Sequence, residues 1–165
     1  MCVRYTLVTD RHAEDLVALD EALVRLRRLW TASRAHVLDE LGQRVEMSSV
    51  LVVEACARRT AGGAETAVGD VAAFLDVEPS TASRLVDRAA QAGLVRRTAS
   101  SVDARRSAVV LTDAGGALRA RAVATRLGWL SSVLGEWPEA DVRVLADVLG
   151  RFADAVASPS ARLLP

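Results

Sequence analysis

The stretch VGDVAAFLDVEPSTASRLVDRAAQAGLVRRTASSVDARRSAVVLTDAG, residues 68–115, decides how this chain folds. A short helix fits residues 70–75, and Asp76 follows as a tight turn. Pro79 suits the first position of a second helix, because a residue there needs no N–H donor. That helix runs to Gln91, and Gly93 is typical of the residue just past a helix end. The stretch therefore begins with two helices joined by a tight turn.

Two strands follow these helices. Residues 94–97 and 107–111 are each predicted to be a short strand, and the polar residues 98–106 join them into a hairpin. Upstream, Ser48 is a candidate N-cap for a largely apolar, buried helix that ends near Arg59. The order helix, helix, tight turn, helix, hairpin is that of a winged helix-turn-helix, which we predict over residues 67–113.

The second helix of the pair has a polar face that suits DNA. Its exposed positions hold Ser80, Thr81, Ser83 and Arg84, followed one turn later by Asp87 and Arg88, whereas Ala82, Leu85, Val86 and Ala89 take the inward face. Residues in the first turns of such a helix reach phosphates and base edges in the major groove. Taken alone, the same pattern also fits an ordinary amphipathic surface helix.

The charge of the chain is zero overall but unevenly distributed. The 21 basic residues are all Arg, a usage that codon bias by itself can explain, and they are matched by 21 acidic residues. Between residues 79 and 106 six Arg stand against two Asp, a local charge of +4 that the rest of the chain offsets. A basic surface on a neutral or acidic body is typical of a DNA-binding domain.

The hairpin adds a second basic group. Arg105 and Arg106 lie at its predicted tip, next to Asp103. An Arg on an extended arm is suited to a narrow minor groove. The alternative for Arg105 is a solvated charge in a turn, paired with Asp103.

Long helices flank the predicted winged region. Apolar residues recur at helical spacing over 13–41, and further helices are expected over 112–134 and 138–157, with a frayed tail at 158–165. The first helix is longer than the core of one small domain requires, so we expect residues 13–41 and 138–157 to be dimerisation helices. The fold class is thus mainly α with a small β-hairpin wing, in a single domain over residues 1–165.

The ordered pattern over residues 68–115 resembles the MarR family of winged helix-turn-helix transcription regulators. The Gly-Leu-Val-x-Arg element of the wing corresponds to Gly93–Arg97, and the Asp-x-Arg element to Asp103 and Arg105. Leu111, Thr112 and Gly115 match the opening of the next helix. Three positions depart from the family. Asp76 replaces the usual Gly of the turn, Glu78 replaces a small polar cap and puts a carboxylate near DNA, and residues 136–138 (Glu-Trp-Pro) stand where a polar cap is common.

The resemblance implies a function as well as a fold. It implies a homodimeric regulator that binds an inverted repeat in double-stranded DNA, with half-sites about one helical turn apart, acts as a repressor and is released by a small-molecule effector. The residues it assigns to DNA, together with the neighbouring basic side chains, are Ser80, Thr81, Ser83, Arg84, Arg88, Arg97, Asp103, Arg105 and Arg106. Asp103 is expected to orient Arg105.

Several residues are candidates for a switch. Trp30 and Trp129 are weak candidates to line a ligand pocket, although aromatic side chains on an apolar face more often form a core or a dimer contact. Cys56 fits a small core residue and Cys2 an incidental thiol. His12, His36 and Glu40 make a poor metal set, so we expect neither a metal nor another cofactor.

Other functions have less support. No nucleophile elbow, phosphate loop or carboxylate pair indicates an enzyme, and neither a membrane-spanning segment nor a signal peptide is evident. We expect a cytoplasmic protein that does not associate with membranes. The rival is a winged-helix protein-interaction module without DNA binding, which Glu78 and the zero net charge favour.

Overall fold

The computed structural model describes residues 10–32, 37–38, 44–102 and 107–158. In chain order they form α1 (Asp10–Ala32), β1 (Val37–Leu38), β2 (Arg44–Val45), α2 (Met47–Ala61), β3 (Thr66–Ala67), α3 (Val68–Leu75), α4 (Pro79–Gln91), β4 (Val95–Ala99), β5 (Ser107–Leu111), α5 (Asp113–Leu134) and α6 (Glu139–Ala157). The chain divides into two compact units, residues 1–118 and 119–165. The predicted fold class, mainly helical with a small β wing, is confirmed.

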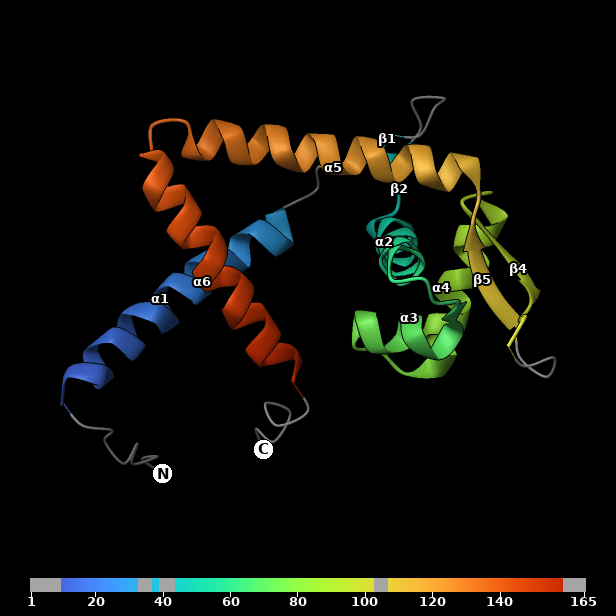
Figure 1. The fold of residues 1–165 in the computed structure, drawn as a ribbon, viewed down its shortest axis with the longest axis horizontal. Helices are drawn as coiled ribbons and strands as arrows, with labels where there is room; N and C mark the ends of the chain where they lie inside the picture. The colour runs from blue at the N-terminus through green and yellow to red at the C-terminus, as the bar shows by residue number, and fades with distance from the viewer. Residues whose placement is uncertain (1–9, 33–36, 39–43, 103–106, 159–165) are drawn as a thin grey trace. The chain divides into compact units, whose positions relative to one another are not determined.

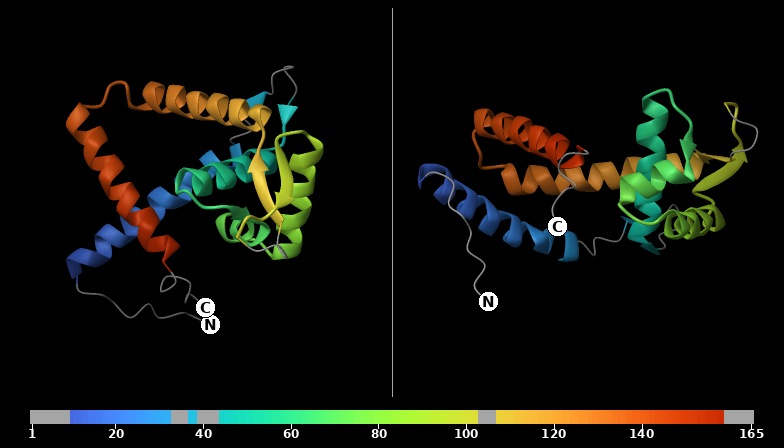
Figure 2. Two further views of the ribbon diagram at one scale, coloured as in Figure 1. Left: turned by 45° about the vertical axis from the view of Figure 1, so that its right-hand side comes forward. Right: turned by 90° about the horizontal axis from the view of Figure 1, so that it is seen from below.

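The core of the first unit lies among α2, α3, α4 and a small sheet. Figures 1 and 2 show these three helices grouped beside the antiparallel β4–β5 pair. The largest fully buried side chains come from all of these elements and from the start of α5: Val52, Val53, Cys56, Thr66, Val71, Val86, Val95, Val109 and Leu118. Removing such apolar surface from water is the main force that holds this unit together.

The sheet has three strands in the order β3-β5-β4, all antiparallel. The β4–β5 ladder pairs Val95 with Leu111 at one end and Ala99 with Ser107 at the other. The third strand, β3, was not predicted from the sequence. It pairs Thr66 with Val109 and so ties the segment before α3 to the middle of the hairpin.

The helix-turn-helix follows the sequence prediction closely. Asp76 ends α3 in the left-handed conformation, with φ 52° and ψ 51°, a geometry that Asp adopts more readily than most residues. Helix α4 spans Pro79–Gln91 as predicted, with Pro at its first position. Helix α3 begins two residues earlier than expected because the Asp70 carboxylate accepts a hydrogen bond from the Ala67 N–H at 2.8 Å.

The junction between the wing and α5 depends on two local features. The Thr112 Oγ1 accepts a hydrogen bond from the Gly115 N–H at 3.1 Å, as an N-cap does, and donates one to the Gly93 carbonyl at 2.6 Å. A Cβ on Gly115 would lie 2.0 Å from the Leu94 carbonyl oxygen. Position 115 therefore requires Gly because two backbone segments approach closely there.

The prediction of one helix over residues 13–41 is wrong in its second part. Helix α1 ends at Ala32, and Val37 and Leu38 form β1, which pairs with Val45 and Arg44 of β2. A short apolar run fits a helix or a strand equally well, so spacing alone does not separate the two. Gly42 and Gln43, where this helix was expected to end, lie outside the described residues.

The expected N-cap of α2 is also corrected. The capping residue is Glu46, in an extended conformation, and its carbonyl accepts hydrogen bonds from the N–H groups of Ser49 and Val50 at 2.9 and 3.2 Å. Ser48 lies inside the first turn, where its hydroxyl donates to the Glu46 carboxylate at 3.3 Å. Because β2 ends at Val45, Glu46 is the first residue free to begin the helix.

The second unit contains the later part of α5 and helix α6. The turn between the two helices is closed by a hydrogen bond from the Trp137 N–H to the Leu134 carbonyl at 2.9 Å, and Pro138 is the N-cap of α6. None of the residues of α6 is buried. Among the described residues, no helix is long and apolar enough to cross a membrane.

Candidate nucleic-acid interface

Helix α4 presents its polar face outward, as predicted. Ala82, Val86 and Ala89 are fully buried, whereas Ser80, Thr81 and Arg84 are exposed. Arg84 makes no hydrogen bond or ion pair with any other residue that the structure describes. A long guanidinium that is free in this way can bind a guanine edge or a phosphate.

The start of α4 carries a carboxylate. Glu78 is the N-cap, and its carbonyl accepts hydrogen bonds from the N–H groups of Thr81 and Ala82 at 2.9 and 3.0 Å. Its side chain is exposed and makes no capping hydrogen bond. A negative charge here stabilises the helix dipole but repels DNA phosphates.

Arg97 and Ser83, both expected at the DNA, contact each other, and Arg97 also contacts Asp87. The Arg97 guanidinium donates to Asp87 Oδ1 through Nε at 3.1 Å and through Nη2 at 2.9 Å. The same Nη2 donates to Ser83 Oγ at 3.1 Å. These contacts join β4 of the wing to the middle of α4. They fix the hairpin against the helix, a role for Arg97 that the sequence pattern did not indicate.

Arg88 also has an intramolecular partner. Its Nη1 lies 3.6 Å from the Glu46 carboxylate at the start of α2, and both side chains are exposed. An ion pair this open to solvent contributes little and exchanges readily with other partners. Arg88 can therefore still turn toward a phosphate.

The remaining predicted site residues are described only in part. Asp103, Arg105 and Arg106 lie outside the described residues, and so do Cys2, His36, Glu40 and the tail 159–165. Trp30 lies in α1, where the structure describes its backbone but not its side chain. Trp129 in α5 is 46% exposed and His12 in α1 is exposed.

The structure shows a further polar cluster at the base of the wing. The carboxylate of Glu65 accepts hydrogen bonds from the hydroxyls of Ser100 and Ser101 and from the Ser101 N–H. These hydrogen bonds lower the pKa of Glu65, Ser100 contributing most, because they stabilise the ionised carboxylate. No local sequence pattern links Glu65 to Ser100 and Ser101, which lie 35 and 36 positions away.

Cys56 is a core residue, as expected. It is fully buried, and burial raises the pKa of its thiol to about 11. The reactive form of cysteine is the thiolate, so a thiol in this environment is a poor redox sensor.

Comparisons with known proteins agree with this geometry. Residues 45–106 match the sequence pattern of the MarR family, a segment that overlaps the predicted winged region and begins with α2. No curated protein sequence shows significant similarity to the chain.

Solved structures match over most of the chain. A MarR family protein from Bacillus stearothermophilus is 19% identical with a TM-score of 0.71, covering 88% of this chain and 98% of its own. A MarR family transcriptional regulator from Rhodococcus sp. RHA1 is 26% identical with a TM-score of 0.58, covering 85% and 96%. CouR from Rhodococcus jostii RHA1, solved with bound p-coumaroyl-CoA, is 28% identical with a TM-score of 0.53, covering 72% and 76%.

The resemblance expected from the sequence is thereby confirmed. Residues 45–106 match the MarR family in sequence, and the fold is similar to that of solved MarR family proteins over most of the chain.

Proposed function

We propose that this protein is a sequence-specific DNA-binding transcription regulator that acts as a homodimer on an inverted repeat. The observation that carries the proposal is the outward face of α4. Ser80, Thr81 and Arg84 are exposed together on the first turns of a helix that a wing flanks. Because helix N-termini and short hydroxyl side chains bind phosphates, this face suits the major groove.

The wing completes the proposed interface. Arg105 is our candidate for the adjacent minor groove, with Asp103 orienting it and Arg106 contacting the backbone. Two strands beside α4 are well placed to direct such a loop, since β4 contacts the helix through Arg97 and Asp87. Glu78 opposes binding, so the protein needs several basic contacts to reach a useful affinity.

Exposed apolar side chains support a dimer. In α1 the exposed residues include Leu16, Val17, Leu19, Leu23, Val24 and Leu26, each 40% exposed or more. In α6 Val144, Val148, Leu149, Phe152 and Val156 are equally open to solvent. Monomeric proteins rarely expose so many large apolar groups on a single helix. We therefore propose that both helices pack against a second copy of the chain.

We further propose that the regulator is a cytoplasmic repressor released by a small ligand. CouR was solved with such a molecule, a coenzyme A thioester. Trp129 is too exposed to belong to the core of its own unit. We propose that it either packs in the dimer or lines a ligand site, and ligand titrations of the Trp fluorescence that Trp129→Phe removes distinguish these roles.

The test is selection of binding sites from random duplex DNA, followed by footprinting and by anisotropy titrations over a range of salt concentrations. We expect an inverted repeat, a steep loss of affinity with salt, and a dimer by sedimentation. Arg84→Ala and Arg105→Ala should each weaken binding by about 1–3 kcal/mol while the protein stays dimeric. Arg58→Ala, which removes an exposed Arg paired with Glu54 on α2, is the matched control.

Failure to retain any duplex at low salt would contradict this function. It would favour the protein-interaction module that the exposed Glu78 and the zero net charge suggest. Equal affinity for the Arg84→Ala variant and the native protein would contradict the assignment of α4 to the major groove.

A further inference from the structure

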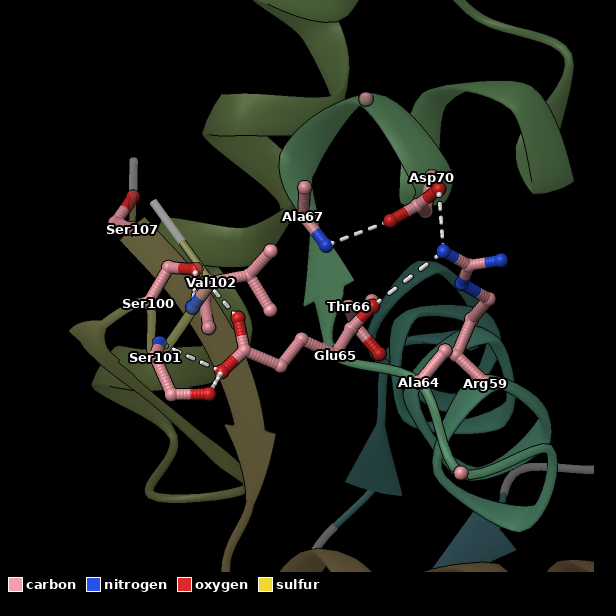
Figure 3. Close-up of a pocket in the computed structure, with 13 residues that line it drawn as sticks. Arg59, Ala64, Glu65, Thr66, Ala67, Asp70, Ser100, Ser101, Val102 and Ser107 are labelled. Carbon is pink, nitrogen blue, oxygen red and sulfur yellow. Dashed lines mark hydrogen bonds and ion pairs between the residues drawn. The ribbon is translucent and has the colours of Figure 1, made fainter. Parts of the chain in front are cut away.

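A carboxylate from outside the hairpin contacts the point where the wing loop begins. Glu65 directly precedes β3, and Ser100 and Ser101 directly follow β4; we call these two serines the wing root. The Ser100 hydroxyl donates to Glu65 Oε2 at 2.5 Å, and the Ser101 N–H donates to Oε1 at 2.7 Å. The Ser101 hydroxyl also donates to Oε1. Figure 3 shows the Glu65 side chain extending toward Ser100 and Ser101.

Glu65 is itself held in place on its other side. The next residue, Thr66, pairs with Val109 of β5, and the Arg59 guanidinium donates to the Glu65 carbonyl at 3.5 Å. Arg59 also forms an ion pair with Asp70 of α3 at 3.3 Å. The wing root is thus connected through Glu65 to α2, α3 and the sheet. Figure 3 shows the contacts of Arg59 with Glu65 and Asp70.

The strand ladder alone does not order the wing root. Pairing of β4 with β5 ends at Ala99 and Ser107, so beyond Ala99 this ladder holds neither serine. The Ser101 N–H would otherwise have to find water or another acceptor. A single ionised carboxylate supplies acceptors for three donors, and these hydrogen bonds lower the pKa of Glu65 below its ordinary value. Hydrogen bonds to a charged group are stronger than those between neutral groups.

We propose that Glu65 is a positioning residue for the wing: it fixes the direction in which the loop leaves β4 and thereby raises the affinity of the wing for DNA. This proposal rests on the DNA-binding function proposed above. It assigns Glu65 no direct contact with DNA.

Electrostatics alone predicts the opposite effect. Glu65 carries a negative charge in the DNA-binding unit, so its neutralisation should reduce repulsion from phosphates and raise affinity. If the carboxylate positions the wing, its removal lowers affinity instead. The sign of the change therefore separates positioning from simple charge.

The first experiment uses the free protein. Amide hydrogen exchange at Ser101 should be faster by about three- to tenfold in Glu65→Ala than in the native protein, with Glu65→Gln between them. Substituting both serines of the wing root by Ala removes the two hydroxyl donors but leaves the backbone N–H of position 101 as a donor to Glu65, so Glu65→Ala in that background should still speed exchange at position 101. Unchanged exchange at Ser101 in Glu65→Ala would overturn the contact.

The second experiment measures affinity for the selected operator by anisotropy, on variants whose urea unfolding matches the native protein. We expect Glu65→Ala to weaken binding by about three- to tenfold and Glu65→Gln by less. Glu78→Gln, which removes a negative charge without touching the wing root, should bind more tightly. Equal or tighter binding by Glu65→Ala would overturn the positioning role. If the native protein binds no DNA, the proposed function fails, while the exchange measurement still decides the contact.

Discussion

The pair formed by Asp87 and Arg97 offers the sharpest test of how the wing is held. The perturbation is a double-mutant cycle of Asp87→Ala, Arg97→Ala and the double variant. In the structure two guanidinium nitrogens of Arg97 reach one carboxylate oxygen, at 3.1 and 2.9 Å. The side chains are 33% and 54% exposed, so solvent screens the pair only in part. Exposed ion pairs contribute about 0.2–1 kcal/mol to the free energy of unfolding. Because Arg97 contacts Asp87 through two nitrogens, we expect this pair to lie at the upper end of that range.

We therefore expect a coupling free energy of about 1 kcal/mol between the two positions. Arg97→Ala should cost slightly more than Asp87→Ala, because it also removes the hydrogen bond to Ser83. The assay is urea unfolding followed by circular dichroism at one fixed protein concentration, since association shifts apparent stability. Arg96→Ala is the matched control. Arg96 is an exposed neighbour on β4 that makes no ion pair or hydrogen bond through its side chain with any other described residue.

A coupling free energy near zero would refute the reasoning. The reasoning would also be refuted if Arg97→Ala left stability unchanged but reduced the slope of log K for DNA binding against log salt concentration by about one unit. That result would show that Arg97 binds a phosphate, as the sequence pattern first suggested, and leaves Asp87 when DNA is present.

Three further outcomes follow from local geometry and from one pKa. Gly115→Ala should destabilise the first unit by about 1–3 kcal/mol, measured by urea unfolding, because its Cβ would overlap the Leu94 carbonyl; unchanged stability would contradict this close approach. Asp76→Gly should match or exceed the native stability and Asp76→Val should lose about 1–2 kcal/mol, since φ there is 52°; equal stability of the two variants would contradict the left-handed turn. In a Cys2→Ser background, Cys56 should react with a thiol reagent slowly until urea is added. Burial raises the pKa of its thiol to about 11. The stability that the buried thiol contributes is therefore present at neutral pH and is lost as pH rises from 9 through 11. Rapid labelling of Cys56 at pH 8 would contradict its burial.

Much of the winged region could be predicted because its signals are local. Pro79 and Gly93 bracket α4, and both act through the conformations that their own backbones allow. Asp76 marks the turn for the same kind of reason. The inward face of α4 follows from helical spacing alone, and the structure buries Ala82, Val86 and Ala89 as expected.

The errors arose where distant residues decide a local conformation. A strand of two residues, such as β1 or β3, has no periodicity to read, and it forms because a partner strand satisfies its backbone. The same limit affected the helix predicted over residues 13–41, whose later part pairs as a strand.

The sequence by itself determined the order of elements from α3 to α5, the polar face of α4 and the uneven placement of Arg, since each depends on residues a few positions apart. Only the tertiary structure decided how the wing is attached. Arg97 reaches Asp87 across 10 positions and Glu65 reaches Ser100 across 35. Such contacts form because folding of the core brings the segments together, and a hydrogen bond then depends on distance in space. No spacing along the chain encodes that distance.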